Sequence, residues 1–269
     1  MAQTRKLALI SGGSSGIGLE CARILLARGY RTMLVARDAD NLREAVVALS
    51  ADAAPDAVEA MAFDVRDAKA CQRAVAEIVA RGDTLDWLIT CAGIVEPGYF
   101  EDLSLESHRR QMETNYFGTL HLVQPVAALM RVQGGGRITL VSSGAAFVGI
   151  AGYAGYAPGK FAVRALGETL RVELAPFGVS VSVAFPPDTD TRQLAQENLT
   201  KPAATKAITA GGGVWPAPVI ARRLLDQAEA GRFMLTPSLL MSLFGWLHSL
   251  YAPAFLRRQI SMLKRYGRT

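Results

Sequence analysis

The sequence is poor in cysteine and histidine, and this scarcity excludes several kinds of site. Three cysteines occur in 269 residues, at Cys21, Cys71 and Cys91, and they match no redox or metal-ligand spacing. An odd count also argues against a complete disulfide framework, so a reduced cytoplasmic setting fits best. The three histidines are isolated along the chain. Metal catalysis is therefore not expected.

The C-terminal tail lacks acidic residues, and the first residues lack a long apolar run. From Arg257 onward the chain carries five cations and no acid, which equals the whole formal net charge of +5. The remainder is electrically balanced, so a basic groove for nucleic acid is not expected. At the other end the first residues run directly into an expected strand, and no export signal is expected there.

What the sequence does contain is an alternation of apolar strands and amphipathic helices. With 50% hydrophobic and 20% charged residues, a chain of this length can form one large domain with a full core. Strands are expected at 7–10, 31–36, 58–63, 85–90, 137–142, 179–185 and 232–236, and helices at 16–28, 39–50, 68–80, 105–130 and 156–174. This order predicts an α/β fold with a doubly wound parallel sheet.

The last third of the chain departs from this alternation. Residues 187–218 are rich in Thr, Ala, Gly and Pro without clear periodicity, which predicts a mobile flap over the ligand crevice. Residues 239–251 are as apolar as a membrane span but shorter than the roughly 20 residues that a span needs. We therefore expect a core at 1–192, a flap and last strand of the same domain at 193–238, and an apolar, basic segment at 239–269 that contacts a membrane or packs on protein.

A glycine pattern between the first strand and the first helix predicts a phosphate site. The missing side chains of Gly12, Gly16 and Gly18 let backbone amides and the helix N-terminus approach a pyrophosphate. The hydroxyls of Ser14 and Ser15 can bond phosphate oxygens. The alternative is an ordinary tight turn between a strand and a helix.

The end of the second strand favours NADP(H) over NAD(H). An NAD enzyme usually places an acid here for the ribose 2′-hydroxyl, whereas this chain has Ala36 followed by Arg37. A guanidinium suits a 2′-phosphate through its charge and its fork of donors. The alternative is that Arg37 only pairs with Asp38 or Asp40 on the surface.

Two further strand ends offer contacts to a dinucleotide. Asp64 could accept a hydrogen bond from an adenine amino group, with Val65 beside the ring. The small residues Ala92 and Gly93 would allow close approach of a cofactor after the fourth strand, although a plain turn explains them equally well.

Tyr156 and Lys160 are the strongest candidates for catalysis. They stand four positions apart on one expected helix, so their side chains meet. A lysine ammonium favours the phenolate and so lowers the phenol pKa from about 10, which makes Tyr156 a usable acid. Ser143 lies thirteen positions earlier, after another strand. Tyr153 competes for the acid role, but the residue four positions after it is Ala157 and not a lysine.

In their order and spacing, these motifs resemble the short-chain dehydrogenase/reductases over about residues 5–192. The resemblance implies a Rossmann-type sheet, a nicotinamide cofactor, and dimers or tetramers. The chain departs from the usual pattern at Pro158-Gly159, inside the Tyr-Lys motif, and at Pro186-Pro187. The elements that carry the resemblance are the glycine turn, Cys91-Ala-Gly-Ile94, Asn115, Ser143, Tyr156-x-x-x-Lys160 and the Pro186 to Thr191 loop.

The same resemblance implies a role for each motif residue. Tyr156 would protonate a carbonyl oxygen while Ser143 hydrogen-bonds it. Lys160 would bind the nicotinamide ribose, and Asn115 would hold a water that links Lys160 to solvent. Cofactor contacts are implied for Gly12, Ser14, Ser15, Gly16, Ile17, Gly18, Arg37, Asp64, Val65, Ala92, Gly93, Tyr156, Lys160, Pro186, Thr189 and Thr191.

The loop Pro186-Pro-Asp-Thr-Asp-Thr191 is similar to that of a narrower group, the 3-ketodihydrosphingosine reductases. This implies NADPH-dependent reduction of the lipid ketone 3-ketodihydrosphingosine to dihydrosphingosine. Asn41, where the group often has lysine, could soften the NADPH preference. An apolar, basic tail would suit a peripheral position on the cytoplasmic membrane face, or it packs on a partner subunit or over its own pocket.

Two alternatives to this function stay open at the level of sequence. One is reduction of another hydrophobic carbonyl, such as a 3-oxoacyl thioester or a steroid. The other is a non-catalytic NADP(H)-binding membrane scaffold, against which the register of Tyr156 and Lys160 argues.

Overall fold

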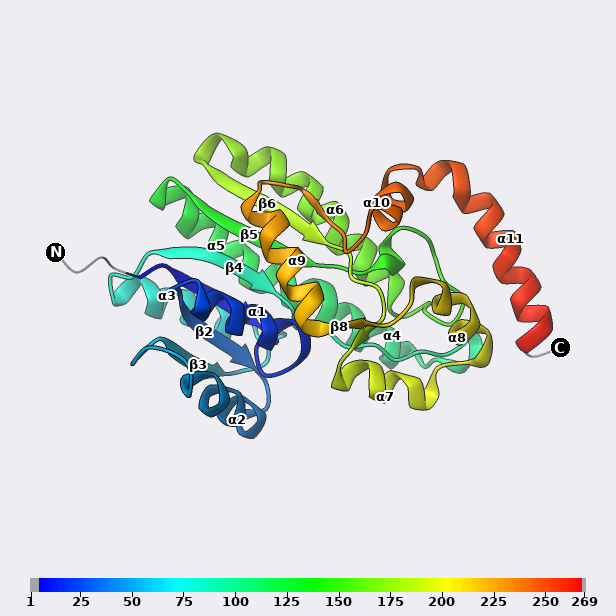
Figure 1. The fold of residues 1–269 in the computed structure, drawn as a ribbon, viewed down its shortest axis with the longest axis horizontal. Coiled ribbons are helices and arrows are strands. Elements are labelled where there is room, and N and C mark those ends of the chain that lie inside the picture. Colours follow the sequence, from blue (N-terminus) through cyan, green and yellow to red (C-terminus); the bar gives the residue numbers. More distant parts are fainter. Residues whose placement is uncertain (1–4, 268–269) are drawn as a thin grey trace.

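The computed structural model describes residues 5–267, in which seven parallel strands form one sheet (Figure 1). The strand order is β3-β2-β1-β4-β5-β6-β9, so the direction of winding reverses between β1 and β4. Ligands bind beyond the carboxyl ends of strands at such a switch point. The strands are β1 (Leu7–Ser11), β2 (Arg31–Ala36), β3 (Val58–Ala62), β4 (Leu85–Thr90), β5 (Gly136–Val141), β6 (Val179–Ala184) and β9 (Met234–Leu235).

Helices cover both faces of the sheet, which confirms the predicted doubly wound fold. Successive residues of β1 enter opposite cores: Leu7 and Leu9 pack on one face, Ala8 and Ile10 on the other. Burial on both faces explains why this strand is a continuous apolar run. The helices are α1 (Gly16–Ala27), α2 (Ala39–Ser50) and α9 (Ala217–Glu229) on one face, and α3 (Ala68–Ala80), α5 (Gly118–Gln133) and α6 (Ala157–Leu174) on the other.

The helix predicted over 105–130 is present, but its middle is a π-helical turn that was not predicted. The structure has α4 (Leu105–Met112), a π-helical turn (Glu113–Phe117) and then α5. A π-helical turn inserts a residue into the regular ladder and is frequent at functional sites. Here it carries Asn115, a candidate site residue. Short 3₁₀ turns also occur at Phe100–Asp102, Gly144–Ala146, Ala175–Phe177 and Ala210–Gly212.

Residues 187–218, which show no clear periodicity in the sequence, contain regular elements in the structure, and their mobility stays a prediction. The side chains that α7 buries are Leu194 and Glu197. Because one of them is charged, this helix has no apolar periodicity in the sequence. The Thr191 hydroxyl begins this helix by accepting a hydrogen bond from the Leu194 amide at 3.2 Å. The elements are β7 (Thr189–Asp190), α7 (Arg192–Thr200), α8 (Ala203–Thr209) and β8 (Trp215–Pro216), with β7 and β8 paired in a second small sheet.

The C-terminal segment forms two helices, α10 (Leu239–Trp246) and α11 (His248–Tyr266), which meet at 100°. In Figure 1 they extend beyond the sheet, in orange and red. Gln259 fastens α11 to the loop after β5, since its side chain binds the Ala151 amide and the Gly149 carbonyl, both at 2.8 Å. Over residues 5–267 no single helix could cross a membrane, whereas the bent pair has sufficient length and apolar character. Arg268 of the basic tail lies outside the described residues.

Gly167 sets how closely α6 packs on the sheet, and this generates a prediction about stability. A Cβ at Gly167 would lie 2.2 Å from Val183 Cγ2 on β6. We expect Gly167→Ala to lower the free energy of unfolding by about 1–3 kcal/mol through overpacking, as measured by denaturant titration. Gly149→Ala is the matched control, because nothing lies within 4 Å of a Cβ there. Equal stability of the two variants would contradict this account of the packing.

Candidate active site

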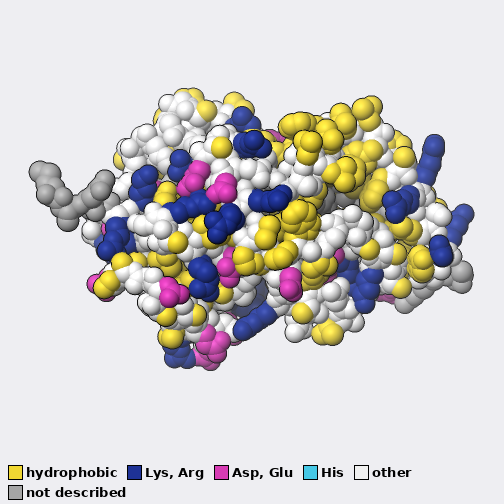
Figure 2. All heavy atoms as spheres, viewed as in Figure 1, with side chains coloured by type: hydrophobic (Ala, Val, Ile, Leu, Met, Phe, Trp, Pro, Cys, Tyr) yellow, Lys and Arg dark blue, Asp and Glu magenta, His cyan; other side chains and the backbone are white. Residues whose placement is uncertain are grey.

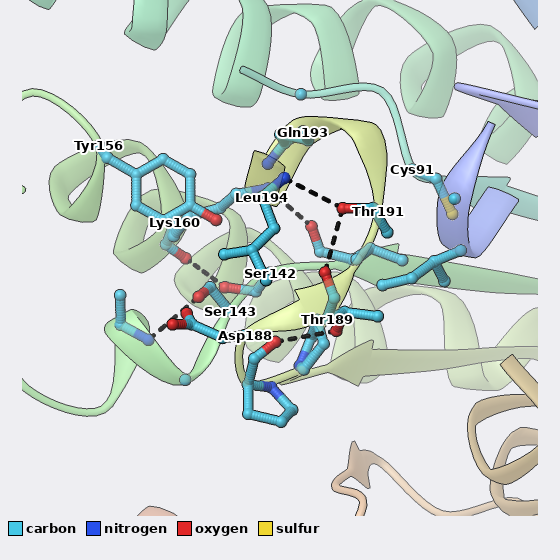
Figure 3. A pocket seen from close by; sticks show the side chains of 18 of the residues that line it. Cys91, Ser142, Ser143, Tyr156, Lys160, Asp188, Thr189, Thr191, Gln193 and Leu194 are labelled. Carbon is cyan, nitrogen blue, oxygen red and sulfur yellow. Dashed lines mark hydrogen bonds between the residues drawn. The ribbon is translucent and has the colours of Figure 1, made fainter. Parts of the chain in front are cut away.

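A cavity of about 650 Å³ opens at the carboxyl ends of the strands, where the winding reverses. It is lined by the turns after β1, β2, β4, β5 and β6 and by parts of α7, α10 and α11. Figure 3 shows Tyr156, Lys160, Ser143 and Asp188 among its walls. All residues predicted for the site line this cavity, with the exception of Asn115.

Two hydrogen bonds attach the first turn of α6 to the end of β5. The Ser142 hydroxyl donates to the carbonyl of Lys160 at 2.7 Å, and Lys160 Nζ donates to the carbonyl of Val141 at 3.1 Å. Ser142 was not predicted as a site residue. The sequence has two successive serines at this strand end, and successive side chains of an extended chain point to opposite sides. One serine could therefore be expected to serve the site and the other to bind the neighbouring helix.

Tyr156 precedes α6 and lies beside Ser143. Burial raises the pKa of Tyr156 above its ordinary value, while a hydrogen bond with Ser143 acts in the opposite direction. The sequence predicted a pKa lowered by Lys160, whose Nζ lies 5.6 Å from the centroid of the Tyr156 ring; burial outweighs that effect in the folded chain. Tyr156 therefore keeps its proton at neutral pH, as a proton donor must.

Lys160 is buried, and burial lowers the pKa of its ammonium to about 8. The group is therefore charged in most molecules at pH 7. Of the three N–H donors that an ammonium has, one is used on Val141. A Cβ at Gly93 would lie 3.4 Å from Lys160 Nζ and 3.0 Å from Asn115 Oδ1, so glycine keeps the space beside the ammonium open.

Asn115 supports the site from behind the cavity wall. Its Oδ1 accepts from the Ile94 amide at 2.8 Å, and its Nδ2 donates to the Ile94 carbonyl at 2.9 Å. Both polar atoms of the side chain thus hold the turn after β4 in place. The role in binding a water stays a prediction.

The unusual Pro158-Gly159 pair fits the start of α6. Pro158 is exposed in the first helical turn, where a missing N–H costs nothing. Gly159 is buried, and a Cβ there would be in ordinary contact with Asn115 at 3.4 Å. Neither residue disturbs the placement of Tyr156 and Lys160.

The glycine turn fits a dinucleotide pyrophosphate. A Cβ at Gly18 would lie 2.3 Å from the Gly12 carbonyl oxygen, and one at Gly12 would lie 2.8 Å from the Ala92 amide nitrogen. Ser15 precedes α1 without making a capping hydrogen bond through its side chain. The first amides of α1 and the hydroxyls of Ser14 and Ser15 are therefore disposed to bind phosphate oxygens.

Arg37 lies exposed at the edge of the cavity and forms no ion pair within residues 5–267. The carboxylate of Asp38 caps α2, accepting from the Asp40 and Asn41 amides at 3.0 and 2.9 Å, and Asp40 pairs with Arg43. The alternative of a surface pair with Asp38 or Asp40 is therefore wrong. The free guanidinium fits a 2′-phosphate.

Asp64 is held by a neighbouring charge. The Arg66 guanidinium pairs with it at 2.7 Å and holds the pKa of its carboxyl below the usual range. Asp64 and Val65 line the same cavity, and their contact with adenine stays a prediction.

Tyr153 is not free to act as the acid. Its hydroxyl donates to Glu197, and its ring meets that of Tyr156 edge to face at 5.5 Å. Lys201 Nζ lies 2.9 Å from Glu197 Oε1 and 3.0 Å from Asp188 Oδ2. This network of four side chains was missed from the sequence. A local signal for it was the four-residue spacing of Glu197 and Lys201, on a segment that was not predicted to be helical.

The far side of the cavity is formed by the C-terminal helices and is mainly apolar, although Arg258 of α11 also lines it. Its lining includes Leu240, Met241, Phe244, Tyr251 and Phe255. Part of the apolar segment at 239–269 therefore covers the chain's own pocket, one of the alternatives left open by the sequence.

The chain is similar to known proteins across most of its length. The family model described as short chain dehydrogenase matches residues 6–202. A 3-ketodihydrosphingosine reductase of Dictyostelium discoideum is 35% identical, over 91% of this chain and 82% of that protein. A 3-dehydrosphinganine reductase of Danio rerio is 36% identical, over 84% and 69%. A solved alcohol dehydrogenase from the archaeon Thermococcus sibiricus, complexed with 5-hydroxy-NADP, has a TM-score of 0.73 at 25% identity, covering 86% of this chain and 95% of that one.

The free guanidinium at the cavity edge generates a prediction about cofactor choice. We expect Arg37→Ala to weaken NADPH binding relative to NADH by about tenfold or more, since charge-assisted hydrogen bonds to the 2′-phosphate are lost. Fluorescence titration with each cofactor measures this ratio. Arg43→Ala removes a nearby cation that pairs with Asp40 and should leave the ratio as in the wild type. An unchanged ratio in the Arg37 variant would contradict the assignment.

Proposed function

Because this chain belongs to the short chain dehydrogenase family, we propose that it catalyses the NADPH-dependent reduction of 3-ketodihydrosphingosine to dihydrosphingosine. The observation that carries this proposal is the two-sided cavity. Tyr156, Ser143 and Lys160 meet at its polar side, and α10 and α11 close its other side with apolar side chains. Relatives named for this substrate match most of the chain and not only the residues that carry the family motifs.

The chain is an oxidoreductase whose residues fit NADPH. The glycine turn and the start of α1 would hold the pyrophosphate, Arg37 the 2′-phosphate and Lys160 the nicotinamide ribose. When bound, this cofactor supplies the hydride that reduces the carbonyl carbon.

The side chains around the carbonyl oxygen supply the proton. Tyr156, protonated at neutral pH, donates its proton to the oxygen as negative charge develops there. Ser143 Oγ already accepts from the Ala145 amide at 3.1 Å, so its own O–H is left to donate to the same oxygen. The buried Lys160 ammonium stabilises the phenolate that remains.

The apolar wall supports a substrate with a long alkyl chain. Leu240, Phe244 and Phe255 belong to the C-terminal helices and line the cavity there. A hydrocarbon chain gains about 0.8 kcal/mol for each CH₂ removed from water. The intact arrangement of Tyr156 and Lys160 argues against a purely structural NADP(H)-binding scaffold.

The outer surface of the same helices supports peripheral attachment to the cytoplasmic face of a membrane. Figure 2 shows a broad hydrophobic area over α10 and α11, with Lys and Arg near the chain end. Leu239, Trp246 and Leu250 are 73%, 67% and 77% exposed. Cations near an anionic bilayer contribute about 1 kcal/mol each, and the described tail carries Arg257, Arg258, Lys264 and Arg265.

Reduction of the lipid ketone should depend on the Tyr156 hydroxyl. Purified protein with NADPH and 3-ketodihydrosphingosine in mixed micelles should oxidise the cofactor and form dihydrosphingosine. We expect Tyr156→Phe to lower kcat/KM by about 10²–10⁴-fold while NADPH still binds, because a general acid contributes that much. Tyr116→Phe, on the π-helical turn outside the cavity lining, serves as the control. Wild-type protein that leaves the lipid ketone unreduced would refute the substrate.

Membrane attachment should depend on the exposed apolar residues of α10 and α11. We expect the triple variant Leu239→Ser, Trp246→Ser and Leu250→Ser to bind vesicles of phosphatidylcholine and phosphatidylserine about tenfold or more weakly in a sedimentation assay. The matched control replaces Val47, Val132 and Val172, which are 73%, 88% and 74% exposed elsewhere, with serine. If both variants pelleted with vesicles as the wild type does, this surface would not be the attachment site.

A further inference from the structure

The cavity contains two carboxylates that take no part in the proton transfer from Tyr156. Asp188 follows β6 and Glu197 lies on α7, and both line the cavity that holds Tyr156. Glu197 receives the Tyr153 hydroxyl on Oε1, and the Tyr153 ring is in edge-to-face contact with the Tyr156 ring. The two carboxylates therefore stand close to the position of the reacting carbonyl.

Each carboxylate has one oxygen engaged and one available. Lys201 Nζ contacts Glu197 Oε1 at 2.9 Å and Asp188 Oδ2 at 3.0 Å. The other oxygens, Glu197 Oε2 and Asp188 Oδ1, accept no hydrogen bond from a residue within 5–267. An ionised carboxylate can accept about four hydrogen bonds, so both groups retain capacity toward the cavity.

The charges of this network do not cancel. Two carboxylates face the single ammonium of Lys201, and these side chains are 8%, 23% and 1% exposed for Glu197, Asp188 and Lys201. Of the other cations that line the cavity, Arg37, Lys160 and Arg258, none forms an ion pair with either carboxylate within residues 5–267. Uncompensated charge is costly in a buried place unless a counter-charge binds there. Two carboxylates and one ammonium leave this network with a net negative charge, which a cation bound in the cavity would offset.

On the basis of the proposed function, we infer that Glu197 and Asp188 bind the protonated 2-amino group of the substrate. In 3-ketodihydrosphingosine the amino-bearing carbon is bonded directly to the carbonyl carbon, so a carbonyl oxygen at Tyr156 brings the ammonium to this network. Lys201 and Tyr153 act as positioning residues, because they hold Glu197 Oε1 and leave Oε2 to the ligand. The cavity thereby selects 2-amino ketones with an apolar chain.

The test compares two substrates that differ only in the amino group. The full chain with saturating NADPH is assayed in the same micelles with 3-ketodihydrosphingosine and with 1-hydroxyoctadecan-3-one. We expect kcat/KM to be about tenfold or more higher for the amino ketone, mainly through a lower KM, since a hydrogen-bonded charge pair contributes that much. Equal kcat/KM values would overturn this inference and leave the proposed function standing. Reduction of neither ketone would refute both.

Single substitutions test whether Glu197 and Asp188 cause the preference for the amino ketone. Glu197→Gln and Asp188→Asn should each lower the ratio of kcat/KM between the two ketones by about tenfold. Glu173→Gln, an exposed acid on α6, should keep the wild-type ratio. Should Glu197→Gln fail to fold by circular dichroism, Asp188→Asn decides, because its side chain is partly exposed. A wild-type ratio retained in the folded variants would assign the network to holding α7 and overturn the inference.

Discussion

The attachment of the first turn of α6 to the end of β5 is the constraint on which the site depends. Ser142 and the Lys160 ammonium each bond across this junction, to the Lys160 and Val141 carbonyls. One junction thereby places Tyr156 beside Ser143 and buries a charge next to the phenol. The burial has a cost, visible in the lowered pKa of Lys160, and Gly93 keeps open the space that a ligand can use to stabilise that charge.

Much of the fold and site could be predicted because the signals are local. Apolar runs mark the strands, and glycines mark the turn at α1, where a Cβ would collide with the backbone. What could not be predicted depends on tertiary contacts. The π-helical turn carries Asn115, which makes two hydrogen bonds to Ile94 on a distant loop, and α7 buries the charged Glu197, with which Tyr153 and Lys201 pair. The raised pKa of Tyr156 likewise follows from burial, which a four-residue spacing does not report.

The C-terminal helices α10 and α11 line the cavity with one set of side chains and expose another set on the outer surface. Gln259 fixes α11 to the loop after β5, so that inward-facing side chains such as Phe244 and Phe255 complete the apolar wall. Leu239, Trp246 and Leu250 remain exposed on the same two helices. A lipid substrate would thus meet an apolar surface first and a mainly apolar cavity wall next, with Tyr156, Ser143 and the two carboxylates at the carbonyl end.

The transfer of label from cofactor to product tests the central claim most directly. NADPH deuterated at C4 of the nicotinamide, on each face in turn, is incubated with the enzyme and 3-ketodihydrosphingosine, and the dihydrosphingosine is analysed by mass spectrometry. The account predicts that one of the two labelled cofactors gives a product carrying deuterium at C3. Cofactor oxidation with no deuterium in the product from either labelled form would contradict it.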